Sequence, residues 1–232
     1  MWTEERYKAF RQELFSKAEE GYRRFHERLL CSSLPVIGLR VPLLRKTAKA
    51  LAKEDGIGFL EVCGRKTYEE RLLYGLVAAA LPLSYEEKLP YWDYYTEELA
   101  ENWAHCDVFC SAVKGRFRGQ EAAFFEHLLR YLGSENPWAV RMGLVMMLSH
   151  YLTEAYFPQV LERTDAVRSD HYYVRMAQAW LLATAWAKDR DRMQEYVENH
   201  HLEDWVFRKF VQKSCESLRV SEADKKFLRS LL

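Results

Sequence analysis

Long apolar runs, strand-like alternation and a net charge are all missing from this chain of 232 residues. No hydrophobic stretch approaches the roughly 18 residues that a membrane-spanning helix requires, so we expect no membrane partner. The formal net charge is +0, which gives no electrostatic argument for a polyanionic partner but leaves room for a local basic face. Hydrophobic residues still make up 49% of the chain, which predicts a folded protein with a substantial core.

Cysteine is scarce and its pattern is irregular. Five cysteines, an odd number at uneven spacings, are typical of reduced thiols. Residues 1–6 are charged and lack the apolar core of a signal peptide, so we expect a cytoplasmic protein. His105, Cys106 and Cys110 contain a cysteine pair, but no second pair of ligands accompanies it. We therefore expect no metal and no cofactor, and the sequence also lacks a phosphate loop and a dinucleotide fingerprint.

Proline and glycine are also few, with six and ten copies, and they leave long segments of helical periodicity. We therefore predict an all-α protein. Gly21 separates predicted helices at residues 2–20 and 22–30. Two prolines and a glycine predict a loop over residues 31–42, and the next helix is expected to run to Lys53.

An aromatic residue opens a helix at regular intervals along the chain, and in most cases arginine follows three positions later. The interval is 35, 35, 34 and then 33 residues. Two helices per such unit are typical of HEAT-like or TPR-like solenoids, in which stacked units share a core and expose a concave surface. We predict one HEAT-like helical repeat domain over residues 1–232. The aromatic positions are Tyr68, Trp103, Trp138, Tyr172 and Trp205, and the arginines are Arg71, Arg141, Arg175 and Arg208.

The repeat register shows two exceptions, Asp107 and Trp180. Four residues after the aromatic position, the other units have Leu72, Met142, Met176 and Lys209. A carboxylate at a mostly apolar position is costly without a partner, so Asp107 calls for a specific reason. Trp103 and Asp107 are one helical turn apart and share a face. Trp180 is the largest side chain eight residues after the aromatic position, and the two exceptions can face one cleft.

Four segments, at residues 37–46, 103–107, 138–141 and 173–180, resemble the AlkD-like DNA alkylation repair family, a superfamily of alkylpurine DNA glycosylases with HEAT-like repeats. The resemblance covers most of the chain in the same order. It implies a right-handed α-α superhelix with a concave cleft. It also implies hydrolysis of the N-glycosidic bond of cationic alkylated purines, such as 3-methyladenine and 7-methylguanine, in double-stranded DNA. We expect a monomer, as is common for solenoids of this size.

The resemblance also implies roles for single residues. Asp107 matches the essential acid, Trp103 and Trp180 match two cleft tryptophans, and Arg141 matches an arginine that contacts the DNA backbone. A carboxylate near the sugar stabilises the positive charge that develops there or orients the attacking water. Indole faces beside that charge add cation–π attraction.

Other DNA contacts are expected from basic residues. Arg175, Arg45 and Lys46 are the DNA-binding candidates, and the basic residues that can form one face also include Arg40, Lys114, Arg116 and Arg118. For the aromatic residue that approaches the lesion near the N-terminus of the family, Tyr22 and Phe25 are both candidates.

Alternative interpretations remain at each of these positions. Asp107 can instead pair with a repeat arginine, and Trp103 and Trp180 can be core residues. The repeated arginines can be solvated or form an ion-pair ladder between repeats. At the level of function, the alternatives are a non-catalytic HEAT-like module that binds damaged or unusual DNA, and a protein-binding solenoid.

Overall fold

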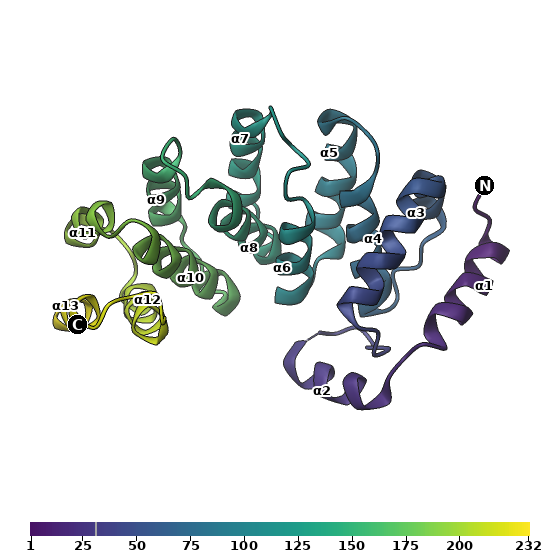
Figure 1. Cartoon of the computed structure of the whole chain (residues 1–232), viewed down its shortest axis with the longest axis horizontal. Coiled ribbons are helices and arrows are strands. Elements are labelled where there is room, and N and C mark those ends of the chain that lie inside the picture. The colour runs from purple at the N-terminus through teal and green to yellow at the C-terminus, as the bar shows by residue number, and fades with distance from the viewer. Residues whose placement is uncertain (31) are drawn as a thin grey trace. The chain divides into compact units, whose positions relative to one another are not determined.

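A computed structural model describes residues 1–30 and 32–232 (Figure 1). Cys31, the first residue of the predicted loop, lies outside the described residues. Every regular element of the described chain is a helix, which confirms the all-α prediction. The chain divides into two compact units, Met1–Glu121 and Ala122–Leu232. A single repeat domain, the right-handed superhelix and the concave cleft stay predictions.

No helix in the described part of the chain has the length and apolar character needed to cross a membrane.

The first unit is built around its fourth helix. Figure 1 shows α4 between α3 and α6, and α4 packs on both of them. Because it has neighbours on several sides, α4 is apolar around most of its circumference, as expected for an enclosed helix. The helices of this unit are α1 (Glu4–Phe15), α2 (Glu20–Leu30), α3 (Val41–Val62), α4 (Tyr68–Ala80), α5 (Tyr85–Tyr94) and α6 (Trp103–Ala112), with a π-helical turn η1 (Tyr95–Leu99) before α6.

The first two helices are divided at a different point from the predicted one. α1 ends at Phe15, and α2 begins at Glu20 and continues through Gly21. The chain leaves the helical path before α2, where the N–H of Glu19 donates to the carbonyl of Gly38 over 3.1 Å. The prediction that Gly21 is the break is therefore wrong, because a contact with a distant loop sets the boundary.

The third helix is interrupted two residues after its predicted end. Asp55 has a non-helical φ of −159° and ψ of 68°, so one helical segment ends just past Lys53 and a second one continues to Val62. Gly56 lies just beyond the kink, and a Cβ there would come within 2.5 Å of the Leu81 side chain. Glycine therefore allows close packing at this position, directly after the interruption.

The second unit continues the same helical pattern. α10 packs on α8 and on α12. Its helices are α7 (Glu121–Leu132), which begins at the last residue of the first unit, α8 (Pro137–Met146), α9 (Phe157–Ala166), α10 (Tyr172–Lys188), α11 (Arg190–Asn199), α12 (Asp204–Glu216) and α13 (Glu222–Ser230), with a π-helical turn η2 (Met147–Tyr151) after α8.

The repeat register is present in the structure. Each of the five recurring aromatic residues occupies the first or second position of its helix, in α4, α6, α8, α10 and α12. Within the units, consecutive members of this series pack on each other, α4 on α6 and α8 on α10 on α12. Equivalent helices are therefore neighbours, as stacking of repeats requires.

Candidate functional site

The beginning of α6 presents three side chains on one face. Asn102 is the N-cap, and its side chain accepts a hydrogen bond from the N–H of His105 over 2.9 Å. The residues between Trp103 and Asp107 are buried, whereas Trp103 and Asp107 are half-buried and Ser111 is exposed. These three residues are four positions apart in turn, so they follow one another along one side of the helix. We call Trp103, Asp107 and Ser111 the α6 face.

His105 has a structural role beneath this face. Its ring is fully buried and stacks on Tyr68 with a centroid separation of 4.7 Å. Nδ1 accepts the N–H of Glu101 over 3.4 Å, so Nε2 carries the proton and donates to the Tyr68 carbonyl over 3.0 Å. Burial lowers the pKa of His105 to about 4, which keeps the ring neutral. In this form His105 fastens α6 to α4.

The described residues contain no group of three or more His, Cys, Asp or Glu side chains that could hold a metal ion.

Trp103 connects α6 to α2. Its indole Nε1–H donates to the carbonyl of Leu29 over 3.0 Å. The last turn of α2 is therefore attached to the first turn of α6. Phe25 and Leu29 are exposed on α2 and one turn apart, so they form a small apolar surface on this helix. The hydrogen bond from Trp103 fixes the end of α2 that carries this surface.

The two candidates for the lesion-contacting aromatic residue are in different environments. Tyr22 is half-buried and stacks on His26 with a centroid separation of 5.0 Å. The Arg40 guanidinium lies over the Tyr22 ring, 4.8 Å from its centroid. Phe25 is 59% exposed. Phe25 therefore offers a ring to a ligand, whereas the Tyr22 ring is engaged within the protein.

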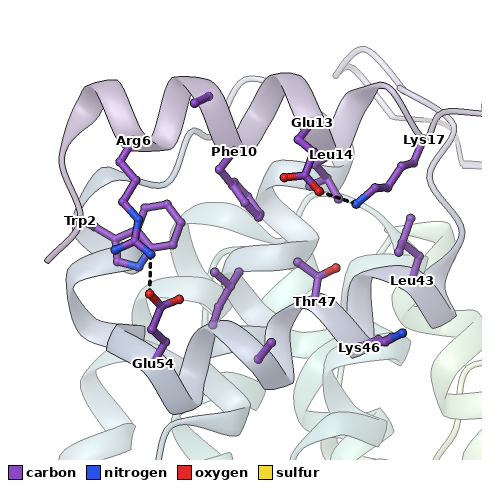
Figure 2. A pocket seen from close by; sticks show the side chains of 13 residues that line it. Trp2, Arg6, Phe10, Glu13, Leu14, Lys17, Leu43, Lys46, Thr47 and Glu54 are labelled. Carbon is purple, nitrogen blue, oxygen red and sulfur yellow. Dashed lines mark hydrogen bonds and ion pairs between the residues drawn. The ribbon is translucent and has the colours of Figure 1, made fainter.

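Arg45 and Lys46 are adjacent in sequence but line different surfaces. Arg45 Nη2 donates to the Val108 carbonyl over 3.3 Å and to Ser111 Oγ over 2.6 Å, which places its guanidinium at the C-terminal end of the α6 face. Lys46 lines a groove between α1 and α3, as Figure 2 shows. Successive residues of an α-helix point about 100° apart, since 3.6 residues make one turn. Of the two predicted DNA contacts on α3, only Arg45 is beside α6.

The repeat arginines contact the backbone at the ends of helices. Arg175 Nε donates to the Ser169 carbonyl over 2.7 Å, and Nη2 lies 3.2 Å from a carboxylate oxygen of Glu203. A further ion pair joins Arg175 to Asp170. Arg175 thus joins the start of α10 to the loop before it and to the residue that precedes α12.

In the first unit, Arg71 makes the same kind of hydrogen bond as Arg175. Its Nε donates to the Arg65 carbonyl over 3.0 Å, again six residues earlier in the chain, and Nη1 donates to the Leu99 carbonyl over 3.3 Å. Arg141 Nη1 donates to the Tyr173 carbonyl over 2.9 Å, and the Arg141 residue is only 5% exposed. The repeat arginines thus make hydrogen bonds to backbone carbonyls, and Arg175 and Arg71 also form ion pairs with Glu203 and Glu101 at the start of the next repeat helix.

Trp180 lies on the surface of the second unit. It is 37% exposed and lines a pocket of about 300 Å³ together with Thr184, Lys213 and Arg219. Trp103, Asp107, Arg45 and Lys46 belong to the first unit, and Arg141, Arg175 and Trp180 belong to the second. A single cleft that contains Asp107 and Trp180 stays a prediction.

Sequence reasoning missed Glu69, which organises the loop before α3. Its buried carboxylate accepts the backbone N–H groups of Ile37, Gly38 and Leu39 over 2.9, 2.7 and 3.2 Å. Gly38 has a φ of 99°, a conformation that suits glycine. Burial is the main influence on the pKa of Glu69 and raises it. The sequence feature that could have indicated this role is the pair of acids after Tyr68 in the first turn of a helix. The same pattern is typical of ordinary helix starts, so it does not single out Glu69.

Comparison with known protein families gives a match over most of the chain. A family model described as DNA alkylation repair enzyme matches residues 10–213, a range that includes every candidate site residue. A search of the curated proteins gave no significant match.

Proposed function

This chain belongs to the DNA alkylation repair enzyme family, and we propose that it is a DNA glycosylase that releases cationic alkylated purines of the 3-methyladenine or 7-methylguanine type. Membership of the family indicates a role in DNA repair. The glycosylase reaction and the type of lesion are what we propose. The observation that supports it is Asp107, a half-buried carboxylate one turn from Trp103, at a repeat position that is apolar in three of the other four units.

The chemistry suits these two side chains. An alkylated purine already carries positive charge, so it leaves with little assistance from a general acid. Positive charge develops on the deoxyribose, where the Asp107 carboxylate would stabilise it or orient the attacking water. A half-buried carboxylate acts through a lower effective dielectric than one in bulk water, which strengthens this interaction. The Trp103 indole would add about 0.5–2 kcal/mol of cation–π attraction.

Two residues of the second unit are proposed to contact the DNA. The exposed ring of Trp180 is available to a nucleotide and is proposed as the second indole of the site. Arg141 is proposed to contact a DNA phosphate, in addition to the bond that it already makes to the Tyr173 carbonyl. Such a contact would fix the position of the DNA without selecting a sequence.

The test is release of free base from methylated duplex DNA by the purified protein. We expect wild-type protein to release 7-methylguanine or 3-methyladenine, and Asp107→Asn to lower the rate by about 10²–10³-fold, the usual effect of removing one electrostatic group from a preorganised site. Asp191→Asn is the matched control, since Asp191 is an exposed acid on α11. Circular dichroism and thermal melting establish that each variant is folded.

The outcomes separate the possible functions. Release by wild-type protein that is unaffected by Asp107→Asn would overturn the role of the acid. DNA binding without release of any base would favour the non-catalytic DNA-binding module.

A further inference from the structure

A small basic pocket lies at the C-terminal end of α6, within the first unit. Three cationic side chains line it, Arg45 and Lys49 from α3 and Arg116 from the segment after α6. Alanines and a leucine of α3, α4 and α6 form the rest of its lining, and its volume is about 140 Å³. Pockets that enclose whole small-molecule ligands are usually about 300–1,000 Å³, so this one suits a single small group.

The positive charge of the pocket is not balanced locally. No acidic residue is among the described residues that line it. Arg45 donates to a carbonyl and to a hydroxyl, and burial lowers the pKa of its guanidinium. A half-buried cation that lacks a carboxylate partner is a favourable site for an anion, because the anion supplies the missing charge.

A buried lysine adds to this imbalance. Lys88 of α5 is only 6% exposed, and its ammonium donates to the Arg116 carbonyl over 3.4 Å. Burial and the nearby positive charge of Arg116 lower the pKa of Lys88. Lys88 holds the segment that carries Arg116, which turns at Gly115 and Gly119 with φ of 72° and 81°. Although the chain is neutral as a whole, positive charge is therefore concentrated here.

The pocket is continuous with the α6 face. Arg45 Nη2 bonds to Ser111 Oγ over 2.6 Å, and Ser111 is one helical turn beyond Asp107. One turn advances about 5.4 Å along the helix axis, and successive phosphates of a DNA strand advance about 3.4 Å along the duplex axis. A phosphate in the pocket would therefore belong to a nucleotide within a few steps of the sugar beside Asp107.

We propose that Arg45, Lys49 and Arg116 bind one backbone phosphate of the DNA strand that contacts Asp107. The identity of the ligand as DNA rests on the proposed function, whereas the preference for an anion follows from the pocket itself. The lysine in this proposal is Lys49, whereas the sequence predicted Lys46. Lys49 lies four residues after Arg45 and therefore shares its face of α3.

The experiment compares two lysines of the same helix. Lys46 and Lys49 are both exposed on α3, but Lys46 lines the groove with α1 (Figure 2) and Lys49 lines the basic pocket. Binding of unmodified, labelled duplex DNA is measured by fluorescence anisotropy at several salt concentrations for wild type, Lys46→Ala, Lys49→Ala and Arg116→Ala. Alanine favours helix, so both lysine variants are expected to fold, and thermal melting checks this.

We expect Lys49→Ala and Arg116→Ala each to reduce the slope of log K against log salt by about 0.9, which is the loss of one phosphate contact. At 0.1 M salt this slope change corresponds to roughly eightfold weaker binding. Lys46→Ala is expected to bind within about twofold of wild type. Equal losses for Lys46→Ala and Lys49→Ala, or no loss for Lys49→Ala, would overturn the proposal.

A second arm separates this proposal from the function on which it rests. If wild-type protein binds and releases bases while Lys49→Ala is unchanged, the phosphate pocket fails and the glycosylase proposal stands. If wild-type protein binds no DNA even at low salt, melting with and without inorganic phosphate is compared for wild type and Lys49→Ala. Stabilisation of wild type alone would then identify a site for free phosphate and overturn the commitment to DNA.

Discussion

The indole N–H of Trp103 and the carbonyl of Leu29 are 3.0 Å apart and join the first turn of α6 to the last turn of α2. Carbonyls in the last turn of a helix lack hydrogen-bond donors within the helix, and the indole N–H is the donor for the Leu29 carbonyl. The same tryptophan is half-buried beside Asp107. Trp103 therefore combines a structural contact with the position from which it would face a bound sugar.

Trp103→Phe keeps an aromatic ring at this position and removes the N–H donor. We expect the free energy of unfolding to fall by about 0.5–1.5 kcal/mol, the net value of a typical hydrogen bond. Amide hydrogen exchange should become faster in the last turn of α2, with α13 as an internal reference. Unchanged protection of α2 would show that the bond to Leu29 does not hold this helix in place.

Glu69→Gln removes the charge that three backbone N–H groups share. Because hydrogen bonds to a charged acceptor contribute about 1.5–3 kcal/mol, we expect a loss of stability of that order in urea unfolding. The amides of Gly38 and Leu39 should exchange faster. Glu86→Gln is the matched control, since Glu86 is an exposed acid in the first turn of α5. Equal stability of the two variants would contradict the role of Glu69.

Arg175→Lys tests whether the repeat arginines have a structural role. A lysine cannot reproduce the planar fork that reaches the Ser169 carbonyl and Glu203 together. We expect urea unfolding to show a loss of about 1–3 kcal/mol. Arg208→Lys, at the same repeat position but exposed and paired with Asp204 one turn away, should change stability by less than about 0.5 kcal/mol. Similar effects at the two positions would argue against this role.

His105 predicts an acid-sensitive contribution to stability. Its pKa is about 4 in the folded protein against 6.5 for an ordinary histidine, so between these values the unfolded chain binds a proton that the folded chain does not. Stability from this residue is therefore present above about pH 6.5 and is lost as the pH falls toward 4, by up to about 1.4 kcal/mol per pH unit.

The measurement is the free energy of unfolding of wild type and His105→Gln between pH 7 and pH 5. The variant is expected to be less stable at pH 7 and to show a smaller decrease toward pH 5. An NMR titration of the His105 ring in wild-type protein measures the same pKa independently. Parallel pH profiles together with an ordinary ring pKa would contradict the prediction.

Much of the helical organisation could be predicted because it depends on local periodicity. The recurring aromatic residues marked the starts of five helices, and their spacing gave the order in which equivalent helices pack. Helix ends were less predictable where distant segments decide them. Glu19 leaves the helical path where it bonds to Gly38, and a second helical segment begins after Asp55, with Gly56 close to the Leu81 side chain. Neither contact is visible in a local pattern.

The sequence by itself determined the class of fold and identified Asp107 and Trp180 as exceptions to the repeat, since both follow from comparing positions along one chain. Only the tertiary structure decided which surface each side chain joins. Arg45 and Lys46 are neighbours in sequence, yet the packing of α3 against α1 and α4 places one beside Ser111 of α6 and the other in the groove with α1. Helical periodicity fixes which residues share a face, and the packing of neighbouring helices fixes what that face meets.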